Sequence, residues 1–155
     1  TARPVPSVER QASVARRLLS HHVRWMPASN PFERYRPRFA EHIEEMRAMG
    51  GEKGGERFHL YAFAYFRQFG AAFFDAAEHL RWLGAHGGVD GVPADDVEAA
   101  ATAYAAISDS AKMLQLRTAR AAMTGKPYDG SATIDAMAAN WQRAADLLRP
   151  TADAG

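Results

Sequence analysis

Apolar residues recur at helical spacing along most of the chain, and they are densest between residues 56 and 83. That segment holds nine of the sixteen aromatic residues of the chain. It predicts one helix of about 28 residues, about 42 Å long. Because the segment is apolar on nearly every side, we expect other helices to surround it, which would make it the axis of the fold.

Four further helices are expected, and proline and glycine residues mark their limits. The apolar spacing predicts them over residues 6–25, 30–50, 93–123 and 131–149, with Pro37 restarting the second helix and Ser131 capping the last. Glycines at 50–55 predict a flexible connector, and His86-Gly87-Gly88 a glycine cap. The pattern therefore predicts an all-α single domain over 1–155, an antiparallel bundle of about five helices around a long aromatic-rich central helix, with flexible ends at 1–5 and 150–155.

Composition limits the classes of function. The chain has 155 residues, 47% of them apolar and 24% charged, and no cysteine. The lack of cysteine excludes disulfides, thiolate nucleophiles, Cys-ligated zinc and iron–sulfur clusters. No uncharged apolar run of membrane-spanning length occurs, and residues 1–26 carry five arginines without the apolar core of a signal peptide. We expect a cytoplasmic protein without a membrane partner. Because the chain begins with Thr1, we also expect it to be part of a longer protein.

The net charge of +1 hides an uneven distribution. Residues 1–38 contain eight arginines against two glutamates, a local balance of +6, and the rest of the chain has a balance of −5. A basic end can attract an acidic partner at low salt. Arg16, Arg17 and Arg24 are the candidate partner-binding residues. The alternative is a solvated helix face, and the basic end contains no nucleic-acid-binding motif.

A line of polar residues interrupts the aromatic segment. Tyr61, Gln68, Asp75 and His79 follow one another at spacings of 7, 7 and 4, so they share one stripe of the helix, with small alanines between them. This pattern fits either a hydrogen-bonded seam between helices or the wall of a ligand pocket. Asp75 and His79 can also pair at i, i+4, which makes them weak candidates for an acid–base pair.

The helix over residues 93–123 carries polar residues on the face that we expect to be buried. Gln115 lies on that face and Lys112 at its border. A buried glutamine left without a partner costs on the order of 1–3 kcal/mol, so these residues are expected to meet the polar stripe. They form either structural ties or part of a binding site.

Other kinds of site have little support in the sequence. Glu56 and His59 match half of a di-metal motif, but no second copy follows. His21 and His22 are adjacent and therefore point about 100° apart on a helix. The glycine clusters lack the ending of a phosphate-binding loop. We therefore expect no metal site and no cofactor.

Short motifs in a fixed order resemble a bacterial family. They are Asn30-Pro31-Phe32, Tyr61-Ala62-Phe63-Ala64, Arg67-Gln68-x-Gly70, Leu83-x-x-His86-Gly87, Lys112-x-x-Gln115 and Ala119-Arg120. Their order is similar to the C-terminal helical region of domain-of-unknown-function family 1839, over roughly residues 8–148. The resemblance maps Tyr61, Arg67, Gln68, Lys112 and Gln115 onto positions of that family.

The resemblance implies a role beside a transferase. Full-length members have an N-terminal half similar to a cysteine-peptidase-type acyltransferase and belong with amino-acid and acyl-carrier-protein chemistry. This chain has no cysteine, so no nucleophile is carried over. The leading hypothesis is a helical accessory or substrate-binding domain of a carrier-protein-dependent acyl or aminoacyl transferase system in small-molecule biosynthesis. Its partners would be an acidic carrier protein or the catalytic half, with a small-molecule ligand. The alternatives are a structural or oligomerisation bundle, and a small enzyme using Asp75 and His79.

Overall fold

The computed structural model describes residues 5–153, and it confirms an all-α bundle. Its helices are α1 (Val8–Arg24), α2 (Pro31–Met49), α3 (Gly51–Ala64), α4 (Phe66–Ala85), α5 (Ala94–Thr124) and α6 (Ser131–Leu148), followed by the short 3-10 helix η1 (Arg149–Ala152). Only Tyr65 interrupts α3 and α4, so the two form one bent rod and the bundle has the five rods that the sequence predicts. In the described residues, β-structure is limited to one bridge between Val89 and Val92.

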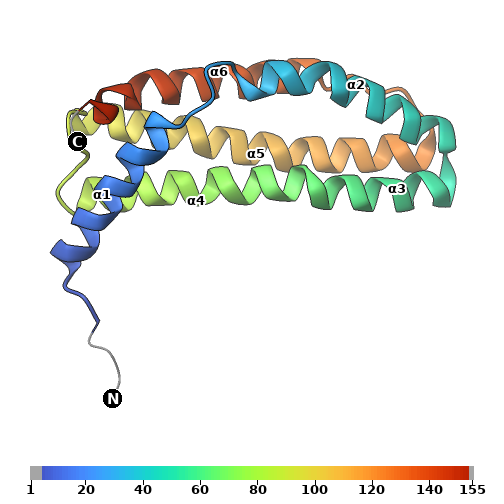
Figure 1. Cartoon of the computed structure of the whole chain (residues 1–155). Helices are drawn as coiled ribbons and strands as arrows, with labels where there is room; N and C mark the ends of the chain where they lie inside the picture. Colours follow the sequence, from blue (N-terminus) through green and yellow to red (C-terminus); the bar gives the residue numbers. More distant parts are fainter. Residues whose placement is uncertain (1–4, 154–155) are drawn as a thin grey trace.

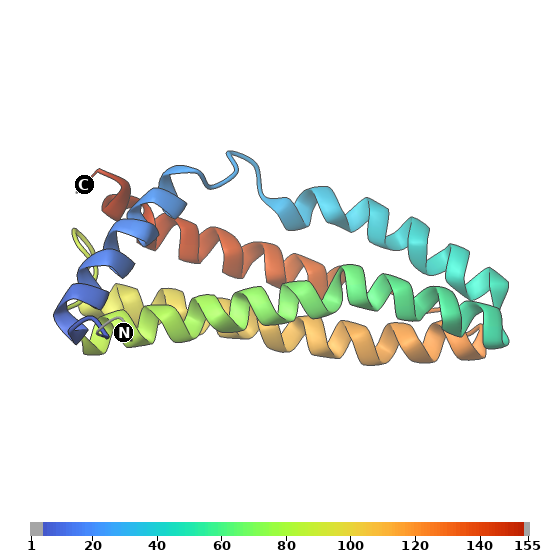
Figure 2. The same ribbon diagram turned by 60° about the horizontal axis from the view of Figure 1, so that its bottom comes forward.

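Four of the rods run side by side along the molecule (Figure 1). The α3–α4 rod and α6 both lie against α5, and α2 contacts α6, α5 and α3. Helix α1 crosses one end of the bundle, where it contacts α4 and η1 (Figure 2). The basic first helix is therefore an addition to a four-rod core.

The axis of the bundle is α5, which corrects the position expected for the aromatic segment. Helix α5 has twelve buried residues, whereas α3 and α4 have four each. In the aromatic rod, Leu60, Phe63 and Phe74 are 68%, 64% and 52% exposed. The expectation of burial on every side was wrong because density of aromatic residues does not show which faces have a neighbour.

The glycine-rich segment is helix rather than the flexible connector expected at residues 50–55. Gly50 and Gly51 have positive φ angles of 61° and 49° and form the turn, and α3 begins at Gly51. At Gly54, an added Cβ atom would lie 2.6 Å from the carbonyl oxygen of Ala122 and 2.8 Å from that of Met46. The glycine therefore lets α3 approach α5 and the end of α2.

Two further boundary predictions were wrong, and others are confirmed. Pro37 lies inside α2 and does not restart it, because the helix already begins at Pro31 after the Asn30 cap. The side chain of Ser131 does not cap α6, since Asp129 accepts hydrogen bonds from the backbone nitrogen and the hydroxyl of Ser131. The glycine cap after α4 is present, with Gly88 N–H donating to the carbonyl of Leu83.

The C-terminal end is ordered further than expected. Residues 149–152 form η1, and Thr151 is only 1% exposed, so the expectation of a flexible end is wrong for residues 150–152. Arg24 ties η1 to α1, because its Nη2 donates to the carbonyl of Ala152 at 2.9 Å. Residues 1–4 and 154–155, also expected to be flexible, lie outside the described residues.

Candidate functional site

Helix α1 crosses α4 above a cavity of about 630 Å³. Four helices and Met26, which lies two residues after α1, contribute to its wall. The other lining residues are Leu18, Leu19, His22, Ala72, Phe73, Asp75, Ala76, His79, Leu80, Tyr104 and Trp141. The volume lies within the range of about 300–1,000 Å³ that is usual for small-molecule sites. A shallower hollow on the neighbouring flank of α1 shares Leu18 and His79.

The helical repeat explains why these side chains face one space. On α4, residues 72, 76 and 79 lie on one face at spacings of 4 and 3. Two of them, Ala72 and Ala76, are alanines, so α1 crosses this face with room left beneath it. On α1, Leu18, Leu19 and His22 follow the same spacing and form the opposite wall.

The cavity has an apolar floor and a polar rim. Leu80, Tyr104 and Trp141 are buried, whereas His22 and Asp75 are exposed at the edge and His79 is half-buried. Burial raises the pKa of Tyr104 to about 12, so its hydroxyl stays protonated near neutral pH. The cavity can therefore hold an apolar group, with polar contacts available where it opens.

Asp75 and His79, two members of the polar stripe, both line the cavity. The pairing expected between them is absent, because no hydrogen bond or ion pair joins these two side chains within residues 5–153. His22 was considered only as a poor metal ligand, yet it lines the same space. The sequence signal for His22 was its helical spacing on α1, since it follows Leu19 by three residues and Leu18 by four.

Tyr61 lies at a different place from Asp75 and His79. Fourteen residues separate Tyr61 from Asp75, or about 21 Å along a straight helix, so a shared stripe does not make a shared site. Tyr61 instead lines a cavity of about 260 Å³ between α2 and α3 with His42, Glu45, Met46, Arg57, Leu60, Ala64 and Tyr65.

Aromatic and phenolic groups form the inner wall of this second cavity. The hydroxyls of Tyr35 and Tyr61 share a buried hydrogen bond. Burial raises the pKa of Tyr61 to about 12, and burial together with Tyr61 raises that of Tyr35 further. The His42 ring stands edge-on to Tyr61 at 5.3 Å between centroids, and its Nδ1 is buried without a hydrogen-bond partner among the described residues. The sequence pattern did not point to His42.

The other predicted ligand-binding residues do not join either cavity. Arg67 and Gln68 are exposed, and Lys112 pairs with Asp109 at 2.8 Å on the surface. Gln115 is half-buried and forms no hydrogen bond to the polar stripe in the described chain. Two other polar contacts join α4 and α5. The Ser108 hydroxyl donates to the carbonyl of Gly70 at 2.8 Å, and Arg81 pairs with Glu98 at 3.4 Å.

The three predicted partner-binding arginines lie close together on α1. Arg16 donates to the carbonyl of His86 at 3.4 Å and pairs with Asp90 at 3.7 Å. Arg24 holds η1, whereas Arg17 is exposed and has no hydrogen bond or ion pair to another described residue. Two of the three arginines are therefore partly engaged within the molecule.

Residues 5–153 contain neither a metal-binding cluster nor a membrane-spanning helix. No group of three or more histidine, aspartate or glutamate side chains is placed to hold a metal ion. Over the same residues, every helix is too short or too polar to cross a membrane.

Comparison with known proteins places the chain in a family. None of the curated proteins or solved structures matches it. The match to a family model extends from the start of α1 to η1, so it includes both cavities. The chain matches the model of the DUF1839 C-terminal domain over residues 8–150, nearly its whole length, and it therefore belongs to that family.

Proposed function

We propose that this domain binds an elongated apolar group, such as the acyl part of a substrate, in the cavity between α1 and α4. The observation that carries the proposal is the cavity of about 630 Å³ with its apolar floor. Burying each methylene group there would contribute about 0.8 kcal/mol to binding. A cavity of this kind favours an elongated hydrocarbon ligand over a compact polar metabolite.

The polar rim would orient the ligand. His22 and His79 come from two different helices, and either ring nitrogen can donate a hydrogen bond to a carbonyl or carboxylate oxygen. Asp75 beside them can accept a hydrogen bond from an amine or amide. The head group of an acyl or aminoacyl ligand would therefore lie at the mouth, with its chain inside.

In this proposal the domain is an accessory part of a transferase system. The chain supplies a binding cavity, and it has no cysteine to act as an acyl-accepting nucleophile. The covalent chemistry would therefore fall to another domain or partner. The chain belongs to the DUF1839 C-terminal domain family, and the link to an acyltransferase is part of this proposal.

A chain-length series tests the cavity. Saturated fatty acids from butanoate to dodecanoate are titrated into the protein, and heat or intrinsic tryptophan fluorescence is recorded, since Trp141 lines the cavity. We expect the dissociation constant to fall about fourfold per methylene until the cavity is full. An affinity that does not change with chain length would overturn the proposal.

A matched pair of variants locates the binding. Ala72 and Ala71 are both exposed alanines of α4, but only Ala72 lines the cavity. Ala72→Trp should block the mouth and weaken decanoate binding at least tenfold, and Ala71→Trp should leave it unchanged. If both variants have the melting temperature of the parent and bind decanoate with equal affinity, the ligand binds elsewhere.

The same proposal assigns the acidic carrier protein to the basic flank of α1. Arg17 is the exposed member of the three arginines. An acidic acyl carrier protein should be retained by the immobilised domain at low salt and released at high salt. Arg17→Glu should reduce retention more than Arg38→Glu, which makes the same change of charge on α2. Absent or salt-insensitive retention would remove the carrier protein from the proposal.

A structural or oligomerisation bundle is the second candidate. The observation that favours it is the presence of exposed apolar side chains on α3, α4 and α5, namely Phe63, Phe74, Leu116 and Met123. Sedimentation velocity at several concentrations separates the two candidates. A stable oligomer that Phe63→Ser dissociates, without fatty-acid binding, would favour the structural role.

A further inference from the structure

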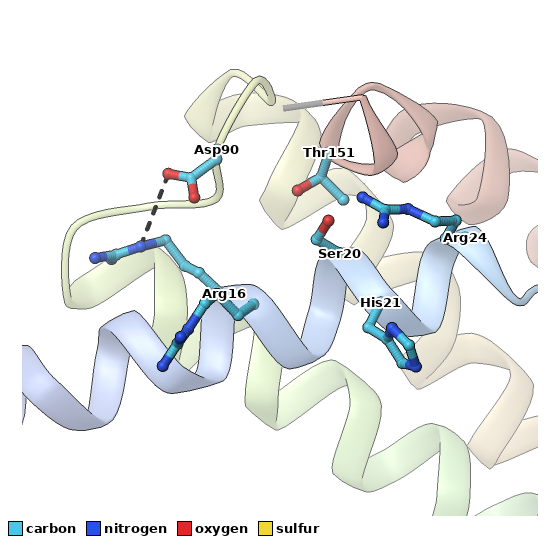
Figure 3. A pocket seen from close by; sticks show the side chains of 7 residues that line it. Arg16, Ser20, His21, Arg24, Asp90 and Thr151 are labelled. Atoms are coloured by element: carbon cyan, nitrogen blue, oxygen red, sulfur yellow. Dashed lines mark ion pairs between the residues drawn. The ribbon is translucent and has the colours of Figure 1, made fainter. Parts of the chain in front are cut away.

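A smaller cleft, separate from both cavities described above, lies on α1 and is formed with the loop between α4 and α5 and with η1. Its volume is about 190 Å³. Figure 3 shows its side chains, with Arg16 and Asp90 on one side and Arg24 on the other. It shares no lining residue with the apolar cavity.

The cleft has a strong excess of positive charge. Arg16, Arg17 and Arg24 line it together with His21, and Asp90 is the one carboxylate among the described residues of its wall. Asp90 pairs with Arg16 at 3.7 Å, and its side chain is 62% exposed, so it lies toward solvent. The arginines therefore leave an uncompensated charge of about +2 around a small space, which favours an anion.

Two of the guanidinium groups are already held in place. Arg16 donates to the carbonyl of His86, and Arg24 donates to the carbonyl of Ala152. A guanidinium has five N–H donors, so each group keeps donors free for a ligand. Because these side chains are positioned before binding, less conformational entropy is lost when an anion arrives.

Two hydroxyl groups complete the inner wall. Ser20 is 9% and Thr151 1% exposed, and Figure 3 shows their oxygen atoms between Arg16 and Arg24. Neither hydroxyl forms a hydrogen bond with another residue of the described chain. Buried hydroxyls normally have a partner, so these two are available to donate to a ligand oxygen.

We propose that this cleft binds the phosphate group of a phosphate monoester. Guanidinium groups bind phosphate oxygens through paired hydrogen bonds, and the hydroxyls of Ser20 and Thr151 would donate to the oxygens that enter deepest. A tetrahedral dianion suits both the small volume and the charge of the cleft. Binding at this cleft does not require the apolar cavity to be occupied.

Inorganic phosphate is the probe for this site. It is titrated at constant ionic strength, and binding is followed by ³¹P NMR line broadening and by the melting temperature of the protein. We expect saturable binding, with sulfate competing and chloride having little effect. Binding that never saturates would overturn the proposal, because general screening by ions gives no endpoint.

Three variants test the residues named. Arg17→Gln removes a positive charge that forms no hydrogen bond or ion pair with another described residue. It should weaken phosphate binding about tenfold. Thr151→Val keeps the shape of the side chain, removes the hydroxyl, and should weaken binding about fivefold. Arg38→Gln removes the same charge from α2 and should have no effect. If the Arg17 and Arg38 variants lose the same affinity, the cleft is not a phosphate site.

Two further arms identify the source of the phosphate. Vesicles with and without phosphatidic acid are sedimented with the protein, and inorganic phosphate is added as a competitor. Retention on the phosphatidic acid vesicles that phosphate reverses would assign the cleft to a lipid headgroup. Saturable binding of free phosphate without vesicle retention would assign it to a soluble phosphate monoester. Ala72→Trp should change neither result, so a failure here is distinct from a failure of the apolar cavity.

Discussion

Gly54 occupies the closest approach between α3 and the end of α5. A methyl group there would lie 2.6 Å from one carbonyl oxygen and 2.8 Å from another, and both atoms belong to backbone that cannot move easily. Gly54→Ala should therefore reduce the free energy of unfolding by about 2 kcal/mol or more.

The neighbouring Gly55 provides the matched control. It lies in the same helix, and the nearest atom to an added Cβ would be 3.9 Å away, on the flexible side chain of Met123. Gly55→Ala should increase the free energy of unfolding by about 0.5–1 kcal/mol, because alanine favours helix. Urea unfolding measures both, and changes of the same sign would contradict the packing described.

The buried hydroxyl pair of Tyr35 and Tyr61 predicts sensitivity to alkali. The pKa of Tyr61 is raised to about 12 and that of Tyr35 further, from an ordinary value near 10. Between pH 10 and 12 the unfolded chain loses phenolic protons that the folded chain retains. Stability that is complete below pH 10 should therefore fall, by up to about 1.4 kcal/mol per pH unit for each hydroxyl.

A double variant isolates the contribution of this pair. Tyr35→Phe with Tyr61→Phe removes both partners of the hydrogen bond, a change that is nearly neutral when neither polar atom is left alone. Its unfolding free energy should match the parent near pH 8 and fall less steeply above pH 10. Equal slopes in urea titrations at pH 8, 10 and 11 would show that other groups control the loss.

At the scale of elements, sequence patterns located the helices well but not their neighbours. Proline and glycine mark chain positions where a helix begins or ends, so the end of α4 and both limits of α5 were predictable, whereas the break at Tyr65 was not. A buried face on α5 was expected, but its position at the axis of the bundle was not, because its many alanines give a weak apolar signal and yet permit close packing. The sequence pattern could suggest Asp75 and His79 as residues of a pocket wall, but it could not add His22 to them. The place where α1 crosses α4 depends on contacts between residues far apart in the sequence.

Helix α1 should be the least protected helix. It has three buried residues among seventeen, and α5 has twelve among thirty-one. Local opening of α1 breaks few apolar contacts, so its amides should exchange with deuterium well before those of α5. Mass spectrometry of pepsin fragments measures this difference. Equal protection of the two helices would mean that α1 opens only with the whole bundle.

At the scale of the molecule, the rods share one core. The buried residues of α2, α3, α4, α5 and α6 form a single contiguous cluster. A single cluster predicts one cooperative thermal transition, with an enthalpy near 110 kcal/mol for a chain of this length. Calorimetry should give equal calorimetric and van't Hoff enthalpies, apart from the early opening of α1. Two separate transitions would divide the chain into two folding units.

The placement of α1 has a consequence for how this family can diversify. Leu18 and His22 shape the apolar cavity, yet both are exposed positions on a peripheral helix. Substitutions at such positions usually change stability by less than about 0.5 kcal/mol, whereas those in α5 disturb the core. Mutation can therefore alter the mouth of the cavity while the four-rod scaffold stays constant, so the shape of the cavity can differ between relatives without a new fold.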